Sequence, residues 1–307
     1  MEIYFDTIFG HGLDYSAKNF MQTGGALVGL TSSEKESLST IDIQQKLLSL
    51  LAENIMPNQK ALILDFAKIG FICMPNDEKD LNKSHYLGSP KHGKKEIEDH
   101  SKDELFHLAT LNLKEFDLNS KWVDNVQMLS FYIKINDSEN GWPEEKDDFK
   151  VLNGNYKVTN HLSEDFEDVI NFNIQPILDL PGYDHSLLYH YKFTEDDRKK
   201  FEILRTVYMH FILGENINSE VNKFLGYPDS IQNCVAYEAE RIFNKRAYSD
   251  EIFNEAIDWC LLLQVSPYCK WFDFFDEFGD GSIYFMIRKD DLSAGDFTKC
   301  QVVVQNT

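Results

Sequence analysis

Short apolar runs of strand length, separated by turn-forming residues, constrain the fold of this chain more than any other feature. They outnumber the helical patterns over the 307 residues and do not alternate with them. Strands that alternate with helices indicate a parallel, doubly wound sheet, whereas successive strands favour antiparallel pairing. The sequence therefore predicts an α+β fold with a largely antiparallel β-sheet and a few helices.

The expected elements follow from apolar periodicity and from capping residues. Ser39 or Thr40 can cap a helix that runs to about Asn54. The clearest helical stripe covers residues 195–213, and shorter helices are expected over residues 237–245 and 250–259. The expected strands cover residues 61–74, 105–113, 127–136, 149–158, 169–175, 260–266, 282–288 and 300–305.

A weak internal echo links two pairs of expected strands. A spacing of 18 residues separates Leu111 from Leu129, and the same spacing separates Val265 from Ile283. A duplicated strand–loop–strand unit would produce this pattern. Chance similarity between apolar strands remains the alternative.

The charge balance limits the classes of partner. The chain has 51 acidic and 30 basic residues, and its formal net charge is −21. Nucleic acids and anionic membrane surfaces require clustered Lys and Arg, so neither is an expected partner. A basic protein partner is compatible with this charge, because the field of the chain would steer it inward.

Targeting signals and metal motifs are absent from the sequence. The N-terminus has no secretory pattern, and no apolar run reaches about 18 residues, so we expect a cytoplasmic protein. The five cysteines are scattered and include no C-x-x-C motif, which predicts neither a disulfide framework nor a zinc site. Four histidines recur in a polar region and are expected to be solvated rather than to bind metal: His85, His92, His100 and His107.

The C-terminal third contains the most specific motif. Residues 224–232, FLGYPDSIQ, resemble the L-L-G-Y-P-D-x-I-Q motif of the YwqG-like family, a bacterial domain of unknown function. Further similar blocks follow in the same order at residues 258–265, 278–292, and 295–297 with 302–305. The chain resembles a divergent member, with its best match over residues 222–307. The resemblance implies an α+β domain over residues 61–307, a divergent N-terminal segment with one helix over residues 1–60, and no established reaction.

Polar and turn residues of the family motif are the first candidate site. Gly226, Tyr227 and Pro228 predict either a tight turn anchored in the core or a loop that lines a ligand. Gln232 and Gln264 lie near apolar runs, so each predicts either a buried hydrogen-bond network or recognition of a peptide or small polar ligand.

The segment KWFDFFDEFGDG, residues 270–281, interleaves aromatic and acidic side chains such as Trp271, Asp276 and Asp280. A calcium loop that began at Asp276 would have Phe278 at its third position and Ile287 at its twelfth, so the signature fails. A tight hairpin turn with packed aromatic residues is one interpretation. An acidic-aromatic contact surface is the other.

No catalytic or cofactor motif is present: the sequence lacks a nucleophile elbow, an H-E-x-x-H motif and a phosphate loop. We therefore expect no cofactor and a non-catalytic binding protein, in one form an immunity-type protein that caps a basic toxin domain. The alternative is an enzyme with a pocket near the Gly226–Asp229 turn and the Asp280–Arg288 hairpin, where Arg288 holds an anion and Tyr284 or Asp280 transfers a proton. An adaptor without a pocket is the third hypothesis.

Overall fold

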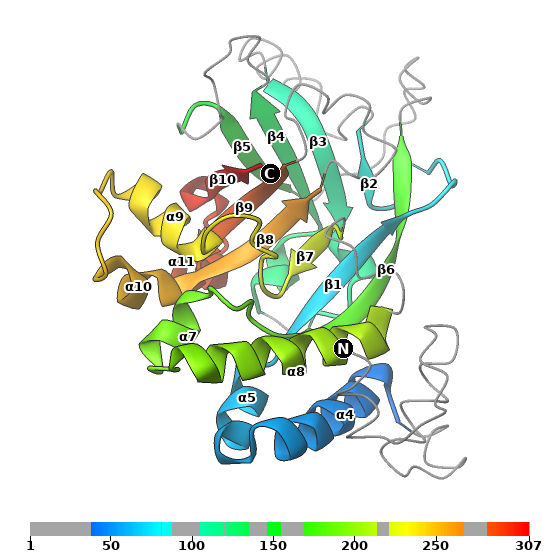
Figure 1. Cartoon of the computed structure of the whole chain (residues 1–307). Helices are drawn as coiled ribbons and strands as arrows, with labels where there is room; N and C mark the ends of the chain where they lie inside the picture. Colours follow the sequence, from blue (N-terminus) through cyan, green and yellow to red (C-terminus); the bar gives the residue numbers. More distant parts are fainter. Residues whose placement is uncertain are drawn as a thin grey trace.

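A ten-stranded antiparallel β-sheet forms the centre of the protein, and helices cover it (Figure 1). The computed structural model describes residues 38–80, 82–87, 105–118, 121–134, 146–154, 169–213, 221–266 and 281–306. The strands are β1 (Lys68–Pro75), β2 (His85–Tyr86), β3 (Leu105–Asn112), β4 (Met128–Lys134), β5 (Phe149–Gly154), β6 (Ile170–Asp179), β7 (Lys223–Leu225), β8 (Trp259–Val265), β9 (Ser282–Arg288) and β10 (Gln301–Gln305). Their order in the sheet is β10-β9-β8-β7-β1-β6-β2-β3-β4-β5. The α+β class and the antiparallel pairing are as the sequence predicts.

The described helices form two groups. The α-helices are α4 (Thr40–Ile55), α5 (Lys60–Phe66), α7 (Ser186–His190), α8 (Glu195–Leu213), α9 (Val235–Phe243), α10 (Ile252–Glu255) and α11 (Lys289–Ala294). Short 3-10 helices cover Pro57–Gln59, Leu113–Glu115, Lys121–Asn125, Ala256–Asp258 and Phe297–Lys299. Helices α4, α5 and α8 lie together below the sheet in Figure 1, whereas α7, α9 and α10 lie on its left. None of the helices in these described ranges is long and apolar enough to cross a membrane.

Helix α4 begins where the sequence predicts. The Ser39 hydroxyl accepts a hydrogen bond from the Asp42 backbone N–H at 3.2 Å, and the Asp42 carboxylate accepts one from the Ser39 N–H at 3.0 Å. This reciprocal pair is a capping box. Buried leucines of α4, among them Leu47 and Leu51, share a core with Phe201 of α8. Residues 38–60 therefore pack directly against the sheet domain.

The strand expected over residues 61–74 is wrong in its first half. Pro57 opens a 3-10 turn that continues into α5, and β1 begins only at Lys68. A proline suits the first turn of a helix because its missing N–H has no helical partner there. Ile63 and Phe66 face the core that α4 and α8 share. The apolar pattern of this short segment is compatible with a helix or a strand, and packing against that core favours the helix.

The internal echo corresponds to two hairpins with the same register. Leu111 pairs with Leu129 across β3 and β4, and Val265 pairs with Ile283 across β8 and β9. Both hairpins also contain a β-bulge at the same position, between residues 107 and 109 and between residues 261 and 263 (261 − 107 and 263 − 109 both give 154). A β-bulge is a specific structural feature rather than a chance irregularity, so two bulges at equivalent positions support a duplicated unit.

The repetition extends over the whole sheet. The strands β1–β5 and β6–β10 occupy mirrored places in the sheet order, with the first strand of each set beside the second strand of the other. Leu87, directly after β2, has φ 56°, and Leu225, at the end of β7, has φ 59°. The Ser84 hydroxyl accepts a hydrogen bond from the Asn112 N–H at 2.9 Å, and the Asn222 side-chain oxygen accepts one from the Ser266 N–H at 2.7 Å.

The two halves of the sheet pack face to face over a common core. The rings of Phe131 on β4 and Phe285 on β9, which are equivalent in the repeat, meet edge to face with centroids 5.0 Å apart. Buried side chains of β3, β4, β8 and β9 fill the space around them. The edge strands β5 and β10 end the sheet, and the 3-10 helix before β10 packs against β5.

Candidate functional site

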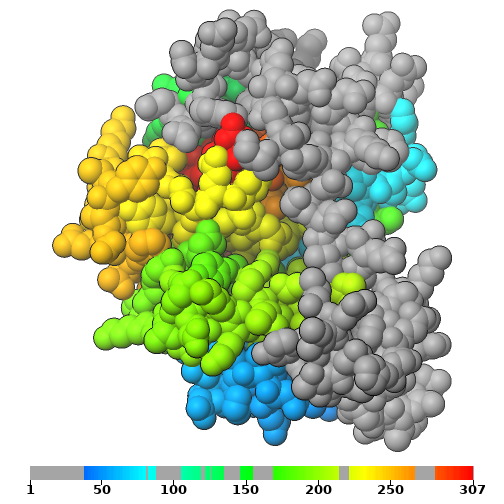
Figure 2. Space-filling model, in the orientation of Figure 1, coloured from blue at the N-terminus to red at the C-terminus, as the bar shows by residue number. Residues whose placement is uncertain are grey.

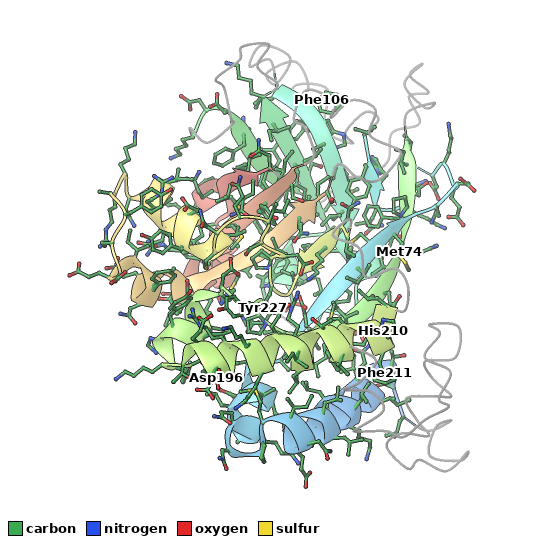
Figure 3. All side chains as sticks on the ribbon, in the orientation of Figure 1. Met74, Phe106, Asp196, His210, Phe211 and Tyr227 are labelled. Atoms are coloured by element: carbon green, nitrogen blue, oxygen red, sulfur yellow. The ribbon has the colours of Figure 1, made fainter. Side chains whose placement is uncertain are left out.

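The Gly-Tyr-Pro turn of the family motif is buried at the centre of the molecule (Figure 3). The Tyr227 N–H donates to Asp179 Oδ2 at 2.8 Å, and the Tyr227 hydroxyl donates to the Phe66 carbonyl at 2.6 Å. Gly226 has φ 79°, and a Cβ atom there would lie 2.6 Å from the same Asp179 oxygen. The turn therefore requires glycine for its backbone conformation and for this close approach.

Three ion pairs fix the turn against the sheet and helix α8. Lys223 Nζ, in a side chain that is 1% exposed, lies 3.2 Å from Asp179 Oδ2 and 2.8 Å from Asp229 Oδ2. The other Asp229 oxygen accepts a hydrogen bond from Arg205 Nη2 at 2.5 Å. Burial opposes ionisation of Asp229, but Lys223 and Arg205 outweigh it and hold the pKa of this carboxyl below its usual range.

The remaining predicted polar groups complete this network. Gln264 Oε1 accepts a hydrogen bond from the Asp229 N–H at 2.9 Å, and Gln264 Nε2 donates to the Val221 carbonyl at 3.1 Å. The Tyr284 hydroxyl donates to the Asp229 carbonyl at 2.6 Å, and burial raises its pKa. Both ends of the Gln264 amide are thus used, and the arrangement has the features of a structural network.

Two other candidates lie apart from this network. Arg288 donates to Glu240 Oε2 at 2.6 Å and lies over the Trp259 ring. Gln232 is exposed and donates to Asn306 Oδ1 at 3.2 Å. In the enzyme hypothesis Arg288 holds the anion and Tyr284 transfers the proton, but Arg288 bonds to α9 and Tyr284 bonds to the central turn. Trp271, Asp276 and Asp280 lie outside the described residues.

The expectation of solvated histidines is wrong for two of the four. His85 on β2 and His107 on β3 are 0% and 7% exposed, and their rings lie 5.9 Å apart. His107 Nε2 is 2.8 Å from the Thr110 hydroxyl. The polar residues around these histidines in the sequence do not predict their burial, because it depends on strands that are distant in the chain. His92 and His100 lie outside the described residues.

A further histidine is buried beside the central turn. The His185 ring meets the Tyr227 ring edge to face at 4.9 Å, and His185 Nδ1 accepts a hydrogen bond from the Leu187 N–H at the start of α7. Burial lowers the pKa of His185 to about 3, and the nearby cations Lys68 and Arg205 add to this effect. His185 is therefore neutral at physiological pH.

An open cavity of about 400 Å³ lies where α7, α9 and α10 meet, on the face that Figure 2 shows in green, yellow and gold. We call it the acidic cavity, because the charged residues of the described ranges that line it are carboxylates: Asp184, Glu238 and Asp250. Four aromatic rings form its walls: Tyr189, Tyr237, Tyr248 and Phe253. Cavities of this size and composition are the usual sites of ligand binding.

The aromatic walls are arranged as stacked pairs. Tyr189 stacks on Phe253 with centroids 4.4 Å apart, and Tyr237 lies 4.6 Å from Phe253 and 6.0 Å from Tyr248. Tyr189 and Tyr248 are two of the few large hydrophobic side chains that are exposed among the described residues, at 38% and 67%. Exposed aromatic rings that gather at a cavity indicate a contact site.

The carboxylate of Glu238 is the most unusual group in this cavity. The residue is only 7% exposed, and its Oε2 accepts a hydrogen bond from Arg241 Nε at 2.7 Å. Its Oε1 is buried and meets no hydrogen-bond geometry with the residues that the structure describes. The Tyr248 hydroxyl lies near this carboxylate, and burial together with the Glu238 charge raises the pKa of Tyr248. A buried carboxylate oxygen without a partner is costly unless a donor or cation from outside completes it.

Of the candidates predicted from the sequence, Gln232 lines the acidic cavity, but the acidic and aromatic residues of this cavity were not predicted as site residues. The signal available was the neighbourhood of aromatic and acidic residues at Tyr183-Asp184, Tyr237-Glu238 and Tyr248 to Asp250. The three segments are joined only by the packing of α7, α9 and α10, so no local pattern connects them.

The fold and its cavities define an α+β protein built on a duplicated antiparallel sheet. A comparison with protein families matches residues 84–305, from β2 to β10, to the domain of unknown function DUF1963. The chain belongs to this family. No curated protein matches the sequence. Within the described ranges, no group of three or more His, Cys, Asp or Glu side chains is placed to hold a metal ion.

Proposed function

We propose that this chain is a non-catalytic binding protein whose acidic cavity receives a cationic group of a basic protein partner. The observation that carries the proposal is the buried Glu238 carboxylate, with one oxygen still unsatisfied among the described residues. A lysine ammonium or an arginine guanidinium would supply a donor to this oxygen, beside the Arg241 guanidinium that pairs with the other one.

The aromatic walls support a cationic ligand. The face of a tyrosine ring attracts cations, and two arginines of the protein already lie over rings of this cavity. Arg241 lies over Tyr248 at 4.7 Å, and Arg198 lies over Tyr189 at 4.3 Å. Burial raises the pKa of Asp184, so a bound cation would also favour the charged form of that carboxyl.

The charge of the whole chain supports a macromolecular source for this cation. A net charge of −21 raises the association rate of a basic protein and penalises acidic competitors. A toxin domain capped by an immunity-type protein is one partner with this chemistry. We also retain as proposals the finer YwqG-like assignment, which rests on the FLGYPDSIQ motif, and a cytoplasmic location, which rests on the scattered cysteines.

Calorimetric titration of the full chain with N-acetylarginine amide tests the cavity. N-acetylcitrulline amide has the same shape without the charge, and we expect it to bind at least about fivefold more weakly, since a cation–π or charge-assisted contact contributes about 1 kcal/mol. Glu238→Gln should lose the preference for arginine. Glu53→Gln on α4, which removes an exposed carboxylate far from the cavity, should retain it.

Two results would overturn this proposal. One is equal affinity for the charged and neutral amides, and the other is an unchanged preference in Glu238→Gln. Thermal unfolding of both variants checks that the fold is intact. Affinity capture from the source cells with wild-type and Glu238→Gln chains then identifies the partner, whose retention should require Glu238 and should fall as salt is added.

A further inference from the structure

A second cavity, of about 610 Å³, lies at the C-terminal end of α9, beside the segments that lead into the edge strands β5 and β10. Acidic residues outnumber basic ones by 51 to 30 in the chain, yet the charged residues that line this cavity are all basic among those that the structure describes. We call it the basic cavity. Its cationic residues are Lys146, Arg241, Lys245, Arg246 and Lys299.

The cations differ in how far they are already neutralised. Arg241 is paired with Glu238, and Arg246 Nη1 is paired with Glu255 at 2.5 Å. Lys146 and Lys299 form no ion pair with any residue of the described ranges, and they reach the cavity from opposite sides, before β5 and before β10. The lysines therefore leave a net positive charge in the cavity, within a protein that is otherwise strongly acidic.

One wall of the basic cavity is apolar. Phe149, Ile242 and Phe243 line it, and Phe243 is 39% exposed although it is a large hydrophobic residue. The cavity thus offers positive charge and an aromatic face together.

We propose that the basic cavity binds a small organic phosphate, with its anionic groups against Lys146 and Lys299 and its apolar or aromatic body against Phe149 and Phe243. Several lysines from separate segments suit a compact ion of multiple charge, because each acts as a point charge. The volume is that of a typical small-ligand site. A nucleic-acid polymer is disfavoured, since it would extend over the acidic surface outside the cavity.

This inference does not depend on the proposed cation site. The two cavities are lined by opposite ends of α9 and by residues of opposite charge, so each favours a ligand that the other repels. A failure of arginine amide binding would leave the phosphate site standing, and the reverse also holds.

Titration with inorganic pyrophosphate, ADP and citrate at low ionic strength tests the proposal. We expect ADP to bind at least about tenfold more tightly than pyrophosphate, because the adenosine adds aromatic contact, and citrate to bind most weakly. The double variant Lys146→Ala/Lys299→Ala should lose at least about tenfold in ADP affinity. Lys199→Ala on α8, which removes an exposed lysine elsewhere, should bind as the wild type does.

Three outcomes would overturn the phosphate site. They are no binding of ADP at millimolar concentration, equal affinity of the double variant and the wild type, and citrate or pyrophosphate binding as tightly as ADP. Phe243→Ala separates the two halves of the site, since it should weaken ADP binding without changing pyrophosphate binding.

Discussion

At the scale of single residues, the central turn shows that the FLGYPDSIQ motif has a structural role in this protein. Asp179 accepts hydrogen bonds from its neighbour Leu180, from Tyr227 and from Lys223, so its carboxylate is fully used inside the protein. A buried ion pair adds little net stability, yet the loss of one partner leaves an uncompensated charge. These residues fix the turn against the sheet and leave ligand binding to other positions.

Gly226→Ala should destabilise the protein by roughly 3 kcal/mol, because a left-handed backbone and a contact with Asp179 both penalise a Cβ atom. Gly295→Ala is the matched control, since Gly295 also has a positive φ of 69° but no atom lies within 4 Å of its Cβ position. That variant should lose only about 1 kcal/mol. Urea unfolding of both proteins measures the difference, and equal losses would contradict the steric argument.

His185 should make stability depend on pH. Its pKa is about 3 in the folded protein and 6.5 in the unfolded chain, so the unfolded chain binds more protons between these values. Stability should therefore fall as the pH drops below 6.5, by up to about 1.4 kcal/mol per pH unit. His185→Asn retains an acceptor for the Leu187 N–H and cannot titrate, so its unfolding free energy should change less between pH 6.5 and pH 4.5. Parallel pH curves for the two proteins would refute this assignment.

At the scale of elements, helix α9 is the piece that organises both cavities. Glu240, 1% exposed, accepts hydrogen bonds from Trp259 Nε1 at 2.7 Å and from Arg288 at 2.6 Å, and so ties the helix to β8 and β9. On the same helix, Glu238 lines the acidic cavity, and Arg241, which pairs with it one turn later, lines the basic cavity. Helix periodicity predicts the buried face of α9, but it does not show which elements lie on either side.

The capping box of α4 gives a test at this scale. Ser39→Ala should cost about 1 kcal/mol, because the first turn loses the acceptor for the Asp42 N–H. Ser49→Ala, within the same helix, should be neutral or slightly stabilising, since alanine has the higher helix propensity. Thermal unfolding of the two variants should thus give shifts of different size, and a Ser49→Ala loss as large as that of Ser39→Ala would show that the cap is not the cause.

At the scale of the whole molecule, the repeated arrangement of the strands determines where the edges of the sheet lie. The repeat brings equivalent strands into mirrored places, and the two halves share one core through Phe131 and Phe285. The same geometry leaves β5 and β10 as facing edges, and the basic cavity lies beside them. Clefts between repeated units are common ligand sites, because each unit supplies one wall.

Self-repulsion by a net charge of −21 should make the folded protein sensitive to salt. Raising NaCl from about 10 mM to about 150 mM shortens the Debye length from about 30 Å to about 8 Å and should raise the melting temperature. Glucose at matched osmolality is the control and should have a much smaller effect. A melting temperature that is constant or falls with salt would show that attractive ion pairs outweigh the repulsion.

The sequence alone determined the class of fold, most strands, the helix over residues 195–213 and the capped start of α4, because these depend on local periodicity and on capping side chains. The sequence also indicated the repeat, because the same spacing of 18 residues separates the paired positions of the β3–β4 and β8–β9 hairpins. Only the tertiary structure decided that residues 60–66 are helical, that His85 and His107 are buried, and that acids and aromatic residues from α7, α9 and α10 line one cavity. These features depend on contacts between distant segments, where the burial of a side chain is set by its neighbours in space rather than by its neighbours in the chain.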